Sequence, residues 1–304
     1  MLSFEQIHID VARNSTDDFN PFHDPQRWQE VQGNPFGAPI VLGFQMEFLA
    51  ADRIARHRRD NGEDGRAVDK GLHFSNYEFL FTDALRAGEG FEVTVKNTVD
   101  RTAKGGGLSN RVVLRKDSGR PVLMGSQSAT AEPRFLADAT PSGLPQLERF
   151  PDRSRIPGSP FFLKRKFLNT SNGKNFALAA LCDQHDYFDE LTERVQFAPL
   201  FTASLLSCAL LEKLWADHHD FAVDPLVYTS HQISVDHRVQ DGLRSNDRVH
   251  ILVDGPALLP PAKGLGGAAV EQYRFHCFGV LHGSQLLFRA ILQLAPLHGF
   301  LGTD

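Results

Sequence analysis

Two long apolar segments dominate the pattern of the chain, at residues 37–59 and 197–219. Each begins with Ala-Pro, at Ala38-Pro39 and again 160 positions later at Ala198-Pro199, and each stays apolar for several turns before polar residues return. Proline is favoured in the first turn of a helix, because the N–H that it lacks would have no intrahelical partner there. The pattern therefore predicts two helices that begin near these prolines, and their narrow polar faces predict that both are largely buried.

Shorter segments in which apolar and polar residues alternate follow each predicted helix. The alternation is clear across residues 91–95 in the first half and 273–277 in the second. A period of two is typical of strands with one buried face. The expected strands lie within residues 76–81, 85–99, 108–117 and 120–132, and within residues 231–239, 243–255, 267–281 and 284–296.

The same order of elements thus occurs twice in the chain. Residues 133–160 separate the two copies, are rich in proline and show no regular pattern, which is typical of a linker. An antiparallel sheet with one apolar face can wrap a buried helix. We therefore predict a tandem α+β protein with two antiparallel sheets, each around a central helix: one domain at residues 1–132, a linker at 133–160 and a second domain at 161–304.

Composition and charge exclude several classes of function. The formal net charge is −5 and the pI is about 6.2, so no basic field suggests nucleic acid as a partner. No apolar run approaches the ~20 residues that span a bilayer, and residues 1–10 do not resemble a signal peptide. Cys182, Cys208 and Cys277 are scattered, which fits thiols in a reducing compartment. We expect a cytoplasmic protein with no membrane segment.

Titratable side chains lie close together in residues 18–24, which read DFNPFHD. Asp18 and His23 flank the rigid pair Asn20-Pro21. Proline fixes its own φ and restricts the residue before it, and an Asn side chain can hydrogen-bond the nearby backbone. The segment is either an ordinary polar turn or a rigid turn that orients both titratable side chains toward one point.

This segment and the order of elements together resemble the MaoC-like family of (R)-specific enoyl-CoA hydratases and 3-hydroxyacyl dehydratases. Residues 18–23 match the family's Asp-x-Asn-Pro-x-His core, and residues 39–43 match its Pro-Ile-Val-x-Gly helix start. The resemblance covers residues 10–132 well, whereas over residues 160–297 only the pattern of elements supports it. It implies a double hot-dog fold, in which one chain contains the two domains that single-domain relatives bring together by dimerising.

The resemblance also implies a role for each matched residue. Asp18 and His23 would hold and activate one water molecule, and Asn20 and Pro21 would support their loop. The backbone N–H of Gly43 would donate to the thioester oxygen, where negative charge develops. The substrate is then an acyl thioester carried by coenzyme A or an acyl carrier protein, and the reaction needs neither a metal nor any other cofactor.

Three positions in the first copy differ from the family pattern. Asp17 stands where the family usually has glycine, and Leu42 stands where it usually has histidine. Phe22 is bulkier than the usual aliphatic residue. The surroundings of the matched pair are therefore altered.

The second copy lacks most of the motif. His185 takes the place of His23, but Ala180 stands five positions before it, where an aspartate would be needed. Ala203 stands where Gly43 would be. We therefore predict one site per chain, in the first half, with the second copy supporting the sheet and shaping a channel for the acyl group.

Two other functions remain open on the same fold. The chain could be an acyl-CoA thioesterase of the hot-dog type, or a non-catalytic protein that binds acyl thioesters. The molecule is expected to be a monomeric pseudo-dimer or a homodimer of double hot dogs. The basic segments 56–59 and 164–166 are either solvated surface or contacts for the phosphates of coenzyme A.

Overall fold

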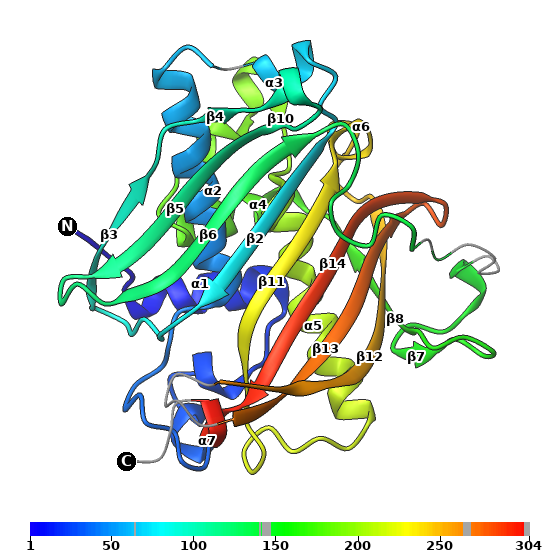
Figure 1. Cartoon of the computed structure of the whole chain (residues 1–304). Coiled ribbons are helices and arrows are strands. Elements are labelled where there is room, and N and C mark those ends of the chain that lie inside the picture. The colour runs from blue at the N-terminus through cyan, green and yellow to red at the C-terminus, as the bar shows by residue number, and fades with distance from the viewer. Residues whose placement is uncertain (64, 140, 142–146, 264–268, 301–304) are drawn as a thin grey trace.

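The computed structural model describes residues 1–63, 65–139, 141, 147–263 and 269–300. Its two halves repeat one arrangement, with helices followed by antiparallel strands (Figure 1). The first half contains β1 (Leu2–Ser3), α1 (Gln6–Thr16), η1 (Pro21–His23), η2 (Arg27–Glu30), α2 (Gly43–Asp60), α3 (Arg66–Asp69), β2 (Phe74–Phe81), β3 (Gly90–Val95), β4 (Val99–Asp100), η3 (Thr102–Lys104), β5 (Leu108–Lys116) and β6 (Pro121–Thr130). The second half contains η4 (Leu147–Arg149), β7 (Ser154–Arg155), β8 (Phe162–Phe167), α4 (Thr170–Ala179), η5 (Gln184–Asp186), β9 (Phe188–Asp189), η6 (Glu190–Thr192), β10 (Arg194–Val195), α5 (Pro199–Ala216), β11 (Leu226–Asp236), α6 (His237–Gln240), β12 (Arg248–Lys263), β13 (Ala269–Leu281), β14 (Gln285–Pro296) and α7 (Leu297–Phe300).

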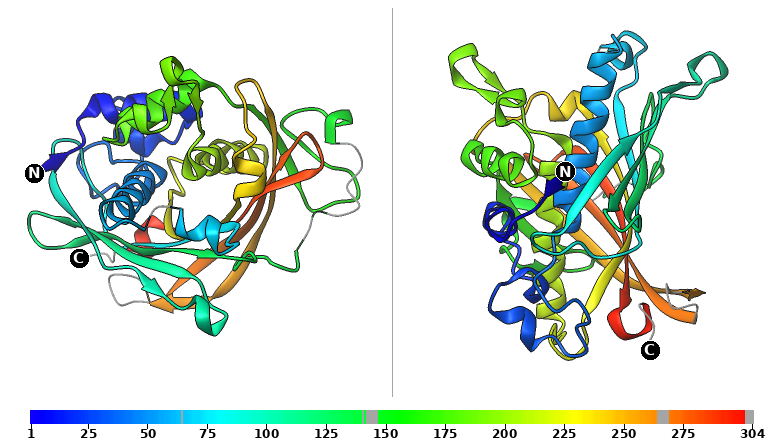
Figure 2. Two further views of the ribbon diagram at one scale, coloured as in Figure 1. Left: turned by 90° about the horizontal axis from the view of Figure 1, so that it is seen from above. Right: turned by 90° about the vertical axis from the view of Figure 1, so that its left-hand side faces the viewer.

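Apart from β9 and β10, which pair with each other, the strands of both halves join into one curved antiparallel sheet. Within the described residues it has 12 strands in the order β1-β3-β5-β6-β2-β11-β14-β13-β12-β8-β7, with β4 beside β5. The two halves meet at β2 and β11, where Tyr77 lies opposite Ile233. Viewed from above, the sheet curves around α2 and α5 (Figure 2). The predicted antiparallel architecture with one central helix per half is confirmed.

The two central helices are buried as predicted, but only one begins where the pattern indicates. α5 starts at Pro199, whereas α2 starts at Gly43, four residues after Pro39. Before α2 the chain is extended instead: Ile40 forms an isolated bridge with Arg86, and the Val41 N–H donates to the Leu85 carbonyl at 2.8 Å. Pairing with this loop thus competes with helix formation and delays the first helix by one turn.

Aromatic side chains fill the space between the two helices. The centroid of the Phe176 ring lies 5.5 Å from that of Phe48 of α2 and 5.7 Å from that of Phe201 of α5. On α5, side chains are buried on every face from Leu200 to Leu214. Burial of each large apolar side chain contributes about 1.5–3 kcal/mol, so this shared core holds the two halves together.

The connection between the halves is partly packed against the strands of the second half. Leu147 and Ile156 are buried with Leu163 of β8, and the Arg165 Nη2 donates to the Leu147 carbonyl at 3.0 Å. Residues 140 and 142–146 of the predicted linker lie outside the described residues, and the predicted domain boundaries stay a prediction. No helix in the described part of the chain is both long and apolar enough to cross a membrane.

Candidate active site

The loop after α1 is held by its own polar side chains. α1 ends at Thr16, and Asp17 turns the chain with a left-handed backbone, φ 57°. The Asn20 N–H then donates to Asp18 Oδ1 at 2.9 Å, and the Phe22 N–H donates to Asn20 Oδ1 at 3.1 Å. These two successive Asx turns lead into the single turn η1. Asn20 therefore does lock the loop through the backbone.

His23 is buried and held in one orientation. Its Nδ1 lies 2.8 Å from the Ile40 carbonyl oxygen, which can only accept a hydrogen bond, so Nδ1 carries the proton and Nε2 carries the lone pair. Burial lowers the pKa of His23 and outweighs the nearby negative charge of Asp18, while the positive charge of Arg13 lowers it further. The imidazole is thus neutral at neutral pH and able to accept a proton at Nε2.

Asp18 is also buried, and the second half of the chain supplies one of its partners. Ser207 of α5 donates to Asp18 Oδ2 at 2.6 Å, and its Oγ lies 3.4 Å from the hydroxyl of Tyr228 in β11. A carboxylate has about four lone-pair positions, so Asp18 can accept further hydrogen bonds. Among the described residues, neither a hydrogen bond nor an ion pair joins Asp18 directly to His23, although their charges interact.

A cavity of about 80 Å³ lies beside His23 and the start of α2. Both halves of the chain contribute to its wall, which is mainly apolar. Asp18 is not among the residues that line it, whereas His23 is. The described residues that line the cavity are Asn20, Phe22, His23, Phe36, Ile40, Val41, Gly43, Met46, Phe81, Asp83, Ala84, Leu226, Val227 and Tyr228.

Gly43 brings a helix N-terminus to this cavity. The N–H groups of Gln45 and Met46 bond to the Leu42 carbonyl, so Gly43 carries one of the amides that a helix start leaves without an intrahelical acceptor. A Cβ at position 43 would lie 2.9 Å from Cζ of Phe81, too close for a carbon contact. Glycine is therefore required here for Phe81 to pack against the helix start.

Comparison with known proteins identifies the fold. No family model matches the chain, and no curated protein matches it by sequence. A MaoC domain dehydratase from Chloroflexus aurantiacus superimposes with a TM-score of 0.62 at 10% identity over 98% of this chain and 93% of its own. A MaoC-like dehydratase superimposes with a TM-score of 0.58 at 12% identity, and the match covers 97% of this chain and 95% of that protein. A third match is a double hot-dog protein of Mycobacterium tuberculosis, with a TM-score of 0.57 at 11% identity. The match covers 97% of this chain and 93% of the other protein.

The chain has the double hot-dog fold. The predicted fold class and the structural resemblance to MaoC-like dehydratases are confirmed over nearly the whole chain. Because the identities are so low, the likeness establishes the architecture, and the roles of Asp18, His23 and Gly43 stay predictions. What the structure adds is their arrangement: His23 and Gly43 border one cavity, and Asp18 lies behind it with Ser207.

Ser207 and Tyr228 were not predicted from the sequence, although the double hot dog brings them to the first-half loop. Ser207 interrupts the apolar run of α5, and this is the signal that points to it. A buried hydroxyl needs a hydrogen-bond partner, which Ser204 finds on the Phe201 carbonyl of its own helix and Ser207 finds on a carboxylate outside it. The partner, Asp18, lies 189 positions away in sequence, and only the fold shows the pairing.

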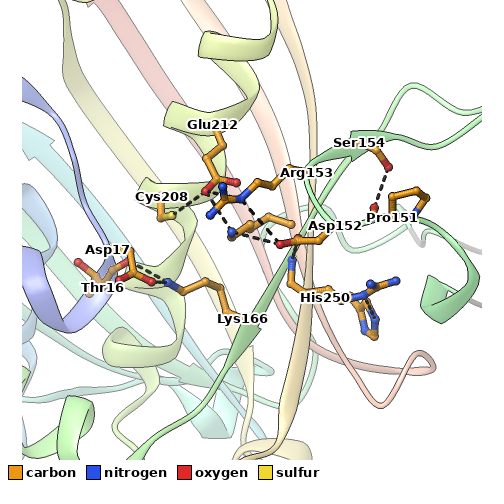
Figure 3. A network of polar contacts seen from close by, with 12 residues as sticks. Thr16, Asp17, Pro151, Asp152, Arg153, Ser154, Lys166, Cys208, Glu212 and His250 are labelled. Atoms are coloured by element: carbon orange, nitrogen blue, oxygen red, sulfur yellow. Dashed lines mark hydrogen bonds and ion pairs between the residues drawn. The ribbon is translucent and has the colours of Figure 1, made fainter.

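The basic segment 164–166 is neither solvated surface nor free to bind phosphate. Lys166 of β8 donates to the Thr16 carbonyl at 3.2 Å and pairs with the Asp17 carboxylate, so it holds the turn just before Asp18 (Figure 3). Lys164 pairs with Glu212 at 3.0 Å, and both side chains are buried. The expectation that this segment faces solvent is wrong, because the packing of the fold brings Lys164 to Glu212 of α5 and Lys166 to Asp17 after α1.

Cys208 lies beside this network and is not an activated nucleophile. Its Sγ lies 3.7 Å from a Glu212 oxygen (Figure 3). Burial raises the pKa of the Cys208 thiol to about 12, and the neighbouring lysines do not offset that effect. A thiol of this pKa is protonated at neutral pH and unreactive.

A second buried titratable pair lies behind the cavity. Glu47 of α2 and His231 of β11 are both fully buried, with Oε1 and Nδ1 2.8 Å apart. Burial raises the pKa of Glu47, and the interaction with His231 opposes that shift only in part. The His231 imidazole also packs on Tyr228 and Phe81, with ring centroids 4.4 Å and 5.0 Å apart. Both of these aromatic residues line the cavity.

The second copy presents no comparable arrangement at His185. That side chain is 66% exposed and bonds to Asp183, two residues before it, at 2.9 Å. Ala180 and Ala203 are buried in the core. His185 therefore lies in a surface turn, as its lack of an aspartate partner five positions earlier indicates.

Proposed function

We propose that this chain is a hydratase or dehydratase that adds or removes water at the 2,3-position of an acyl thioester. The observation that carries the proposal is the orientation of His23. Its Nδ1 is fixed on the Ile40 carbonyl, and the residue borders an apolar cavity that also reaches the N-terminus of α2. A base, an apolar space for an acyl group and an amide for an oxyanion are thus adjacent.

In the proposed hydration, His23 Nε2 accepts a proton from water while the water oxygen bonds to C3 of the enoyl group. The electrons of the double bond move toward the thioester, and the Gly43 N–H donates to the oxygen that becomes negative. The imidazolium then returns its proton to C2, so that hydroxyl and hydrogen are added and the enzyme is regenerated. Dehydration runs through the same steps in reverse.

Asp18 has an electrostatic role in this scheme. Its carboxylate interacts with His23 and stabilises the imidazolium that forms during the reaction. Asn20 and Ser207 each donate to one of its oxygens, which holds the carboxylate in place.

The test is to incubate the protein with crotonyl-CoA and identify the product by mass. The proposal predicts 3-hydroxybutyryl-CoA without release of free thiol. Free coenzyme A from crotonyl-CoA or butyryl-CoA would instead indicate a thioesterase. Saturable binding without any product would indicate a protein that binds acyl thioesters without catalysis. Repeating the assay with crotonyl-acyl carrier protein distinguishes the two carriers.

The same assay bears on oligomeric state, because Asp18, His23, Ser207 and Tyr228 all belong to one chain. We propose that a single chain is sufficient to form the site, as expected of a pseudo-dimer. We propose that specific activity does not depend on protein concentration. Loss of activity on dilution, together with a change in mass by light scattering, would indicate that a second chain is needed.

A further inference from the structure

We infer that the cavity beside His23 limits the substrate to a short acyl group of about three or four carbon atoms, an inference that rests on the proposed function. The cavity volume is about 80 Å³. A protein cavity of about 150 Å³ holds one benzene molecule, which has six carbon atoms. About half that volume admits a crotonyl or butyryl group and excludes an octanoyl group.

The wall on the α2 side cannot retreat to admit a longer chain. Phe81 and Tyr228 both pack on the His231 imidazole, which is fully buried and lies 2.8 Å from the Glu47 carboxyl. Phe81 also fits closely against Gly43. Displacing either ring would move a buried titratable pair, and burying such groups without their partners is costly.

The wall on the loop side is apolar and supported from behind. Phe22 and Phe36 contact each other edge to face, with ring centroids 5.9 Å apart. Behind Phe22 lie the buried Val31 and Leu297, which form one cluster with it. Phe36 is only half-buried and packs at the edge of this small cluster, outside the main core, so its removal should enlarge the cavity with little effect on folding.

The size limit is tested by comparing kcat/KM for crotonyl-, hexenoyl-, octenoyl- and decenoyl-CoA. We expect a steady decrease with length, with octenoyl-CoA at least about tenfold below crotonyl-CoA, since each misfitting methylene in an apolar pocket changes kcat/KM by about tenfold or more. An octenoyl-CoA value equal to or above that of crotonyl-CoA would overturn the inference and leave the proposed reaction intact.

Two variants change the cavity in opposite directions. Phe36→Ala should raise octenoyl-CoA turnover relative to crotonyl-CoA, and Ala84→Leu should lower crotonyl-CoA turnover by about tenfold. Ala87→Leu makes the same change in the same loop, but at a position that does not line the cavity, and should have no effect on chain-length preference. Unchanged preference in both cavity variants would contradict the inference.

Binding separates the size limit from the reaction. Titration calorimetry with butyryl-CoA and octanoyl-CoA, which cannot be hydrated, should give a dissociation constant at least about tenfold lower for butyryl-CoA. If no enoyl thioester turns over but this difference holds, the proposed reaction is wrong and the size limit stands. If octanoyl-CoA binds as tightly as butyryl-CoA, the size limit is wrong.

Discussion

Ser207 of α5 donates a hydrogen bond of 2.6 Å to Oδ2 of Asp18, and this contact joins the degenerate half of the chain to the loop that carries the candidate site. Both side chains are buried. The second hot-dog domain is therefore part of the site as well as a support for the sheet. The pairing also gives the buried Ser207 hydroxyl a partner outside its own helix.

Removal of this hydroxyl should affect both activity and stability. Ser207→Ala leaves a buried carboxylate with one donor fewer, which costs about 1–3 kcal/mol of unfolding free energy. We expect kcat/KM on crotonyl-CoA to fall by about tenfold or more, because Asp18 is less well held. Ser204→Ala is the matched control, since that buried hydroxyl donates to the Phe201 carbonyl within the same helix. Equal kcat/KM in the two variants would show that Ser207 does not support the site.

The pH profile should report the buried imidazole. Burial lowers the pKa of His23 below its usual value of 6.5, so the neutral base persists into more acidic solution. The acidic limb of kcat/KM against pH should therefore have its midpoint below 6.5. A midpoint above that value would mean that the charge of Asp18 outweighs burial.

The lowered pKa of His23 also predicts how the stability of the fold depends on pH. In the pH range between the folded and unfolded pKa values of His23, the unfolded chain binds more protons than the folded one. Stability is therefore fully present above the unfolded pKa and decreases as the pH falls through the folded pKa. His23→Gln should remove this contribution, which denaturant unfolding at a series of pH values below neutrality would measure. Identical pH dependence in both proteins would contradict the assignment.

A side chain at position 43 should disturb the packing of Phe81. Gly43→Ala places a Cβ 2.9 Å from that ring and should destabilise the fold by about 1–3 kcal/mol. Gly242→Ala is a suitable control, because the nearest atom to its added Cβ lies at 3.5 Å. Thermal unfolding of both variants measures the difference. Equal melting temperatures would show that Phe81 moves aside without cost.

The buried pair behind the cavity should behave as a coupled unit. His231→Phe leaves the Glu47 carboxyl buried without its partner and should cost about 3–5 kcal/mol of unfolding free energy. The double variant Glu47→Gln, His231→Phe should recover part of that loss, because no titratable group then remains buried. A double-mutant cycle measures the coupling. Additive effects would mean that the two side chains do not stabilise each other.

The pattern of apolar and polar residues predicts the helices and strands, whereas the contacts between distant residues depend on how the chain folds. Apolar segments and period-two alternation predict the buried helices and the strands, since both depend on neighbours in sequence. The start of α2 was misplaced because the Val41 N–H bonds to Leu85, which lies far along the chain. The burial of Lys164 was missed for the same reason, since Glu212 reaches it only through the packing of β8 on α5.

Some residues of the candidate site can likewise be predicted from the sequence, whereas others are found only in the fold. Asp18, Asn20 and His23 are readable from one short motif, and the loop bonds that Asn20 makes follow from its position. Ser207 and Tyr228 could not be assigned from the motif, because their contacts depend on the pairing of two halves. Among the described residues, neither a hydrogen bond nor an ion pair joins Asp18 to His23, and Asp18 does not line the cavity; both features are likewise set by tertiary packing.

The most direct test of the central proposal compares kcat/KM for crotonyl-CoA hydration in the wild-type protein, His23→Gln and His185→Gln. His185 is the exposed counterpart of His23 in the second copy and controls for loss of a histidine. We predict that His23→Gln loses at least about a hundredfold in kcat/KM while its unfolding transition remains cooperative, as expected when a general base is removed. His185→Gln should match the wild type. Equal hydration rates for His23→Gln and the wild type would contradict the assignment of His23 as the base.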